Sequence, residues 1–131
     1  MTQAIDASAV IAALIDDGPD GRWCEDRLAE DDLAAPHLMP FEAANIVRRA
    51  EARGAIDRST ALQALVDLRR LDVHLISFEP VADRVATLRR NLTAYDASYV
   101  ATAELVGGRL VTLDSKLAGA PGIHCPVVVA P

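Results

Sequence analysis

The stretch that most constrains the fold of this chain covers residues 95–117, YDASYVATAELVGGRLVTLDSKL. A helical pattern begins near Asp96, ends at the glycine pair 107–108, and gives way to an apolar run over residues 110–113 that leads into Asp114. A short apolar run after a Gly-Gly break indicates a buried strand. Asp114 then follows the carboxyl end of a strand, which is where open α/β sheets bind ligands. We expect Asp96, at a helix start, to face the same edge.

The rest of the chain alternates between strand and helix patterns. Further strands are expected at residues 3–5, 33–35, 73–77 and 126–130. Helices are expected at residues 8–15, 20–30, 41–53 and 57–71, and after Pro80, where the apolar stripe Val81, Val85, Leu88, Leu92 has helical spacing. Strands separated by helices predict a parallel sheet covered on both faces. We therefore expect residues 1–131 to form a single domain with a three-layer α/β/α fold.

Composition limits the function classes. Apolar residues make up 51% of the chain, which excludes a disordered protein. The 13 basic residues are outnumbered by 19 acidic ones, giving a net charge of −6, which argues against a simple basic nucleic-acid binder. Cys24 and Cys125 lack metal-ligand spacing and predict a reduced, cytoplasmic protein. The apolar run at residues 9–15 is too short to span a membrane, so no membrane association is expected.

Four acidic residues stand where a parallel sheet would gather them at one edge. Asp6 and Asp114 follow strands, whereas Glu42 and Asp96 lie in first helical turns. Each has an alternative explanation, because acids cap helices and form turns. Four like charges at one edge nevertheless repel one another unless a cation separates them. Oxygen-only ligands favour Mg²⁺ or Mn²⁺ over zinc.

The chain resembles the PIN-domain ribonucleases, and specifically the VapC toxins of bacterial toxin–antitoxin pairs. The resemblance extends over nearly the whole chain and is carried by Asp6-Ala-Ser8, Glu42-Ala-Ala-Asn45, the run YDASYVA from Tyr95, and LVTLDSKLA around Asp114. It implies that Asp6, Glu42, Asp96 and Asp114 form a catalytic, metal-binding quartet, with Asp6 and Asp96 as the firmest ligands. It also implies that Ser8, Asn45 and Thr112 are polar residues supporting that site.

The resemblance further implies an activity and its partners. The expected protein is a Mg²⁺-dependent endoribonuclease toxin, with Mn²⁺ as an alternative ion, that cleaves RNA with a metal-activated water. A cognate VapB-like antitoxin with an arginine-bearing tail would cover the acidic groove, and the toxin would form a homodimer. The stripe Leu62, Leu65, Leu68 is broad for a lone surface helix, so we expect part of it at a dimer or antitoxin surface.

Two other function classes remain open from the residues alone. One is an aspartyl-phosphate enzyme or receiver with Asp6 as nucleophile and Lys116, the only lysine, as charge partner. A phosphatase of that type would carry a second Asp two residues after the first, and Ser8 stands there instead. The other is a PIN-like interaction module without catalysis, against which the complete quartet argues.

Overall fold

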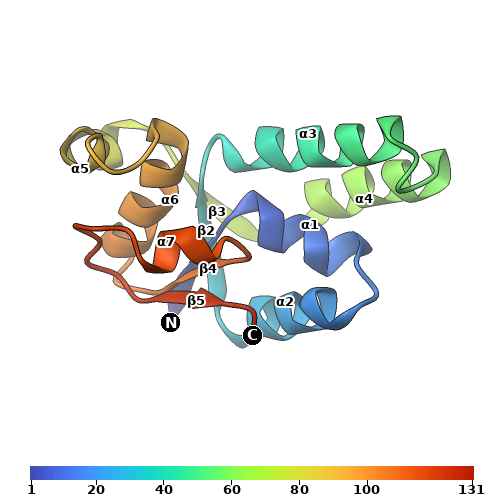
Figure 1. Cartoon of the computed structure of the whole chain (residues 1–131), viewed down its shortest axis with the longest axis horizontal. Helices are drawn as coiled ribbons and strands as arrows, with labels where there is room; N and C mark the ends of the chain where they lie inside the picture. The colour runs from blue at the N-terminus through green and yellow to red at the C-terminus, as the bar shows by residue number, and fades with distance from the viewer.

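The computed structural model describes residues 1–131 and is built around a five-stranded, wholly parallel sheet (Figure 1). The strand order is β3-β2-β1-β4-β5. The strands are β1 (Thr2–Ile5), β2 (Asp32–Pro36), β3 (Val73–Ile76), β4 (Leu110–Thr112) and β5 (Val127–Val129). The chain therefore builds outward from β1 in one direction and then returns to add β4 and β5 on the other side.

Helices cover both faces of this sheet, which confirms the expected three-layer α/β/α architecture (Figure 1). One layer holds α1 to α4 and the other holds α5 to α7, with the short 3₁₀ turn η1 before α5. Their bounds are α1 (Ala7–Ile15), α2 (Pro19–Glu30), α3 (Met39–Ala52), α4 (Arg58–Arg70), η1 (Glu79–Val81), α5 (Ala82–Leu88), α6 (Ala94–Leu105) and α7 (Ser115–Ala118). Reversal of the winding direction after β3 places the later helices on the opposite face, because parallel crossovers are right-handed.

The core lies where α1 and α6 pack on the two faces of the central strands. Ile5 and Val111, paired across β1 and β4, are fully buried, as is Val100 of α6. Many of the other core residues are alanines, whose short side chains allow close approach of helix and sheet. A strand buried on both faces reads as a continuous apolar run, which is why the sequence pattern located β4.

The glycine pair before β4 is required by backbone geometry. Gly107 has φ of +67°, in the left-handed region where residues with a Cβ are strained. A Cβ on Gly108 would lie 2.0 Å from the carbonyl oxygen of Thr2, inside any allowed contact. The pair thus ends α6 and brings the chain directly against β1.

Two helical details differ from the sequence expectation. The apolar stripe predicted a helix continuing through Leu92, but α5 ends at Leu88. The N–H groups of Asn91 and Leu92 both reach back to the Leu88 carbonyl, which closes the helix in a tight turn. The single turn α7 was not predicted, because four residues are too few for a periodic pattern.

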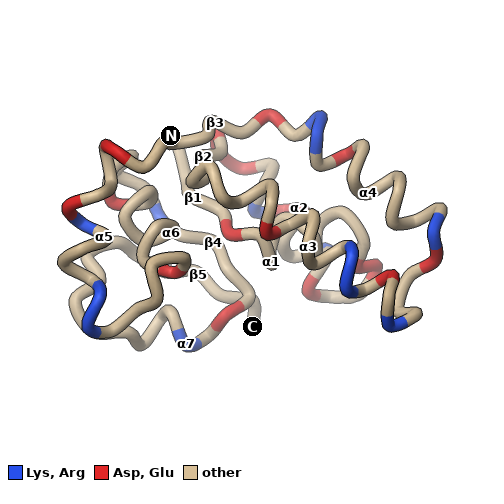
Figure 2. The backbone as a smooth tube through the Cα atoms, turned by 90° about the horizontal axis from the view of Figure 1, so that it is seen from above, with Lys and Arg blue, Asp and Glu red and all other residues tan.

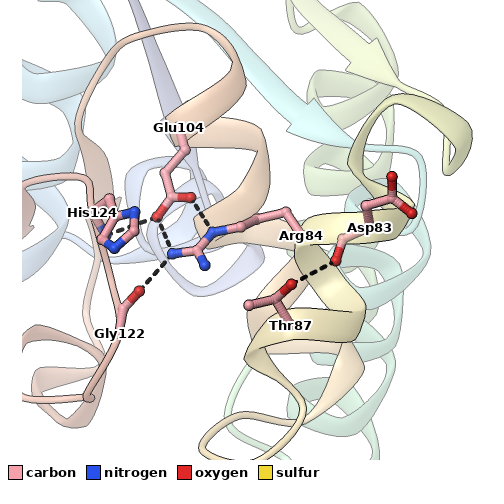
Figure 3. Close-up of polar contacts among 6 residues, drawn as sticks. All are labelled: Asp83, Arg84, Thr87, Glu104, Gly122 and His124. Atoms are coloured by element: carbon pink, nitrogen blue, oxygen red, sulfur yellow. Dashed lines mark hydrogen bonds and ion pairs between the residues drawn. The ribbon is translucent and has the colours of Figure 1, made fainter.

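A partly buried ion pair between Arg84 and Glu104 attaches the segment before β5 to α5 and α6 (Figure 3). Arg84 donates to both oxygens of Glu104, at 2.5 and 3.1 Å, and to the Gly122 carbonyl at 2.5 Å. Glu104 also accepts the backbone N–H of His124 at 2.8 Å. Burial acts to raise the pKa of Glu104, but the bonds from Arg84 and His124 outweigh it and lower the pKa. The charged pair therefore holds the chain that leads into β5.

None of the helices combines the length and the apolar content that crossing a bilayer would require.

Candidate active site

Two of the four acids follow the pair of strands between which the winding of the sheet reverses. Asp6 comes immediately after β1, and Asp114 comes two residues after its neighbour β4. This position between β1 and β4 is the topological switch point, where open parallel sheets bind ligands outside the carboxyl ends of their strands. Glu42 lies in the first turn of α3, which follows β2 on the other side of β1.

Asp6 is buried and held by three hydrogen bonds. Its Oδ1 accepts the Ser8 hydroxyl at 2.7 Å and the Ala9 N–H at 3.0 Å, and its Oδ2 accepts the Thr112 hydroxyl. Burial raises the pKa of Asp6, hydrogen bonds from Thr112, Ser8 and Ala9 oppose the shift, and the negative charge of Asp114 adds to it. A carboxylate offers about four lone-pair directions, so this network fixes its orientation and still leaves capacity for another ligand.

Thr112, the last residue of β4, links Asp6 to Asp114. Its hydroxyl donates to Asp6 and accepts the backbone N–H of Asp114 at 2.9 Å. The Ser8 hydroxyl likewise accepts a long bond, 3.4 Å, from the N–H of Leu113. The two hydroxyls therefore join the ends of β1 and β4. The structure places Ser8 and Thr112 against Asp6, where the family resemblance had put them.

Glu42 receives its hydrogen bond from the other helical layer. The hydroxyl of Tyr99, on α6, donates to Oε1 of Glu42 at 2.5 Å. Tyr99 is only 3% exposed, and its burial together with the nearby charge of Glu42 raises the pKa of its hydroxyl. A protonated phenol is the form that can donate, so this environment maintains the bond to the Glu42 carboxylate.

Asp96 lies in the first turn of α6, but it does not cap that helix. The cap is Thr93, whose hydroxyl accepts the N–H of Asp96 at 3.2 Å. Burial raises the pKa of Asp96, and the negative charge of Asp114 raises it further. Asp114 therefore lies near enough to influence both Asp6 and Asp96 electrostatically.

Capping explains only half of the quartet. Asp6 caps α1 through the Ala9 N–H, and Asp114 accepts the Lys116 N–H at 3.0 Å. Neither Glu42 nor Asp96 accepts a backbone N–H. None of the three ion pairs in the chain includes a member of the quartet. Four acids thus stand at one edge of the sheet without a basic side chain bound to any of them.

Asn45 is a predicted site residue that the structure does not bond to any of the four acids. It is exposed on α3, one turn after Glu42, and its Oδ1 accepts a hydrogen bond from Nε of Arg48 at 2.9 Å. It makes no hydrogen bond to the four acids. Tyr99 is the functional residue that sequence reasoning missed, although it belongs to the YDASYVA run. Its helical spacing of three from Asp96 was the available signal.

The donor set is suited to a hard divalent cation. All four side chains offer carboxylate oxygens, their charges lack basic partners, and both Asp6 and Asp96 are held in sites that oppose an unneutralised charge. As the side chains stand, no three His, Cys, Asp or Glu residues form a closed ligand group. Mg²⁺ does not require one, because it commonly keeps several waters and binds through one or two carboxylates.

Positive charge is spread over the outer helices. Figure 2 shows Lys and Arg segments on α3, α4, α5 and α7, interspersed with acidic ones. Of the 13 basic residues, 12 are arginines and one, Lys116, is a lysine. The positive charge is therefore dispersed over several helices and is not gathered on one of them.

Comparison with known proteins decides the family. The PIN domain matches residues 4–123. VapC ribonuclease Mb0985 of Mycobacterium bovis is 38% identical over 127 residues, which are 97% of each chain. The chain belongs to the VapC ribonucleases of the PIN-domain family. The resemblance read from Asp6, Glu42, Asp96 and Asp114 is thereby confirmed at the level of family.

Solved structures of toxin–antitoxin proteins share the fold. The structure of VapBC2 from Rickettsia felis bound to a DNA fragment from their promoter superposes with a TM-score of 0.70 and 14% identity over 100% of both chains. A toxin–antitoxin complex from Klebsiella pneumoniae gives a TM-score of 0.64 with 19% identity, over 98% of both chains. At these identities the likeness establishes the three-layer architecture, and the chemistry must be argued from the side chains of this VapC-family chain.

Proposed function

We propose that the protein is a metal-dependent endoribonuclease toxin that uses Mg²⁺, with Mn²⁺ as a possible substitute. The observation that carries the proposal is that Asp6, Glu42, Asp96 and Asp114 of a VapC-family chain have no basic partners, with Asp114 near enough to raise the pKa values of Asp6 and Asp96. Asp6 and Asp96 are the main candidate ligands, and Glu42 and Asp114 complete the set. A bound divalent ion would supply stabilisation of phosphoryl charge and a lowered pKa for an attacking water.

The residues of the chain have separable roles in this proposal. Ser8 and Thr112 hold the Asp6 carboxylate in one orientation, and Tyr99 does the same for Glu42. Supporting bonds of this kind fix ligand geometry and are commonly as important as the ligands. Asp114 keeps the local potential negative beside Asp6 and Asp96, which favours a cation there. Exposed Arg48, on the same helix as Glu42, offers a partner for RNA phosphates.

We further propose an antitoxin partner and a homodimer. The Klebsiella relative of this fold was solved as a toxin–antitoxin complex, and a basic tail would complement an acidic edge. Leu62 and Leu65 of α4 are 52% and 38% exposed, and a hollow of about 430 Å³ lies between α4 and the edge strand β3. A monomeric mass by light scattering, unchanged on adding a basic antitoxin peptide, would count against both associations.

No structural observation favours an aspartyl-phosphate enzyme. Lys116 is exposed, and it contacts the site through its backbone N–H, which donates to Asp114, and not through its ammonium group. Asp6 is also buried and bound by three donors, which opposes its use as an attacking nucleophile.

RNA cleavage tests the proposal. The parent and Asp96→Asn are incubated with a mixed single-stranded RNA in Mg²⁺ and in EDTA, and products are separated by length. We expect internal cleavage by the parent in Mg²⁺ only, with recovery when Mg²⁺ is restored after EDTA, and a loss of at least 100-fold in Asp96→Asn, on the order of a lost transition-state group. Cleavage by Asp96→Asn at the parental rate would refute the metal assignment.

A further inference from the structure

Two exposed aromatic rings flank the acidic edge of the sheet. Phe41 directly precedes Glu42 in the first turn of α3, and Tyr95 directly precedes Asp96 in the first turn of α6. Phe41 is 80% exposed and Tyr95 is 63% exposed. Phe41 and Glu42 line the same hollow, together with Tyr95. Two of the four acids are therefore each preceded in the sequence by an exposed aromatic residue.

The two rings line one hollow although they come from opposite helical layers. Its volume is about 310 Å³, and Leu38, Phe41, Glu42, Asn45 and Tyr95 line it; we call it the aromatic hollow. This volume lies at the lower end of the roughly 300–1,000 Å³ found for ligand pockets. Glu42 belongs both to the aromatic hollow and to the acidic quartet, so the hollow opens directly beside the candidate active site.

Neither ring has a role in holding the fold together. Phe41 and Tyr95 lie outside the core cluster, and the Tyr95 hydroxyl makes no hydrogen bond within the chain. Large aromatic side chains are normally at least partly buried, and neighbouring exposed ones mark binding surfaces. A planar ligand stacked between or upon them would remove this apolar surface from water.

The polar rim of the aromatic hollow selects among planar ligands. Asn45 accepts a bond from Arg48 through Oδ1, which leaves its amide NH₂ available as a donor. Arg48 is exposed and takes part in none of the ion pairs of the chain, so its guanidinium is available to an anion. A ring surface, an amide and a cation are together the groups that bind a base with its phosphate.

We propose that the aromatic hollow binds one unstacked base of single-stranded RNA, next to the phosphate that is cleaved. The inference rests on the proposed ribonuclease function and adds the residues that hold a base of the substrate. The base stacks on Phe41 and Tyr95, the Asn45 amide donates to its edge, and Arg48 contacts an adjacent phosphate. A base-paired strand cannot present its base faces in this way, so the hollow favours single-stranded loops and ends.

The test compares steady-state cleavage of one single-stranded oligoribonucleotide by ring variants in Mg²⁺. Phe41→Ala and Tyr95→Ala should each raise KM by roughly 5- to 150-fold, the range for loss of one base-stacking ring, while kcat stays within about twofold of the parent. Tyr95→Phe keeps the ring and should retain the parental KM. Leu105→Ala removes a comparably exposed side chain, 50% exposed at the far end of α6, and should also match the parent.

A second readout reports stacking itself. Fluorescence of 2-aminopurine, placed in turn at each position around the cleavage site, should be quenched at one position by the parent and not by the Phe41→Ala/Tyr95→Ala double variant. Parental KM values in both alanine variants, with an active parent, would overturn the inference and leave the ribonuclease proposal intact. Equal KM increases on duplex RNA, or unchanged KM with loss of self-association, would assign the rings to another contact. A parent that fails to cleave RNA would instead refute the underlying function.

Discussion

The hydroxyl of Tyr99 on α6 donates a 2.5 Å hydrogen bond to Glu42 on α3, 57 positions earlier in the chain. The two helices cover opposite faces of the sheet, so this bond joins the two helical layers at the edge where the four acids lie (Figure 1). A buried donor that faces a charged acceptor restricts the rotamers of both side chains. Tyr99 therefore positions Glu42 relative to Asp6 and Asp96.

Removing this hydroxyl should weaken metal binding more than it weakens the fold. In Tyr99→Phe, Glu42 loses its donor, which costs on the order of 1–3 kcal/mol for a bond to a charged group. We expect a lower melting temperature and a several-fold weaker apparent affinity for Mg²⁺ or Mn²⁺, measured by calorimetric titration. Tyr95→Phe is the matched control, since the Tyr95 ring is exposed, and it should leave both values unchanged. Parental metal affinity in Tyr99→Phe would limit Tyr99 to a structural role.

Thr112 should matter through its hydroxyl and not through its shape. Thr112→Val is nearly isosteric but removes both the bond donated to Asp6 and the one accepted from the Asp114 N–H. The Asp114 N–H then becomes unsatisfied, so we expect destabilisation of about 1–3 kcal/mol in chemical denaturation and a reduced cleavage rate. Thr102→Val is the control, because Thr102 is equally buried but bonds only the Ser98 carbonyl within its own helix. Equal cleavage by the two variants would contradict a supporting role for Thr112 at the site.

The pair Arg84–Glu104 should stabilise the protein without affecting catalysis. Because the folded pKa of Glu104 is lowered, its contribution is present above the unfolded pKa and is lost as pH falls through the folded pKa. Glu104→Gln should therefore lower the free energy of unfolding at neutral pH by about 1 kcal/mol and lose less stability than the parent on acidification. Glu30→Gln alters a more exposed pair and should have a smaller effect. Denaturant titrations at neutral and acidic pH measure the stability of both variants. A Glu104→Gln variant as stable as the parent would refute the stabilising role of the Arg84–Glu104 pair.

The metal-free protein should lose stability as pH rises through the range in which its site acids ionise. The folded pKa values of Asp6 and Asp96 are raised, so the folded state binds more protons than the unfolded chain between the unfolded and folded pKa values. The stability term from these two groups is therefore favourable at low pH and is lost as pH passes the folded values. Asp96→Asn should flatten this dependence in EDTA. A parent and variant with superimposable pH profiles would show that Asp96 carries no such cost.

Sequence pattern predicted most of the fold because the strands and helices have strong local signals. Leu110 to Thr112 is buried on both faces, and the glycine pair before it has a geometry that other residues cannot adopt. The early end of α5 has a local cause, because its apolar stripe passed through Leu92 while the backbone turned at Leu88. Periodicity records which residues face the core and is less informative about where hydrogen bonding ends.

The site was predictable in its acids and less so in its supporting contacts. Asp6 and Asp114 follow strands and could be placed at the edge from topology alone. The bond from Tyr99 to Glu42 depends on how two layers meet, and no local pattern encodes a contact across 57 positions. Asn45 shows the converse, since its motif position suggested support for the acids while its side chain bonds Arg48 at the rim of the aromatic hollow.

Metal-dependent thermal stability tests the central claim that the four acids form a cation site. The parent, Asp96→Asn and Asp57→Asn are melted in EDTA and in Mg²⁺ at fixed ionic strength. Asp57 caps α4 through the Thr60 N–H and lies outside the quartet, so it is a matched control for an acid that only caps a helix.

A site of this kind predicts that Mg²⁺ at about 100 times its dissociation constant stabilises the parent by roughly 2.7 kcal/mol, which raises the melting temperature by several degrees. Asp96→Asn should melt above the parent in EDTA, because one repelling charge is gone, and should respond less to Mg²⁺. Asp57→Asn should show the full parental response. No Mg²⁺ shift in the parent, together with an Asp96→Asn variant less stable than the parent in EDTA, would contradict the cation site and reduce the acids to structural groups.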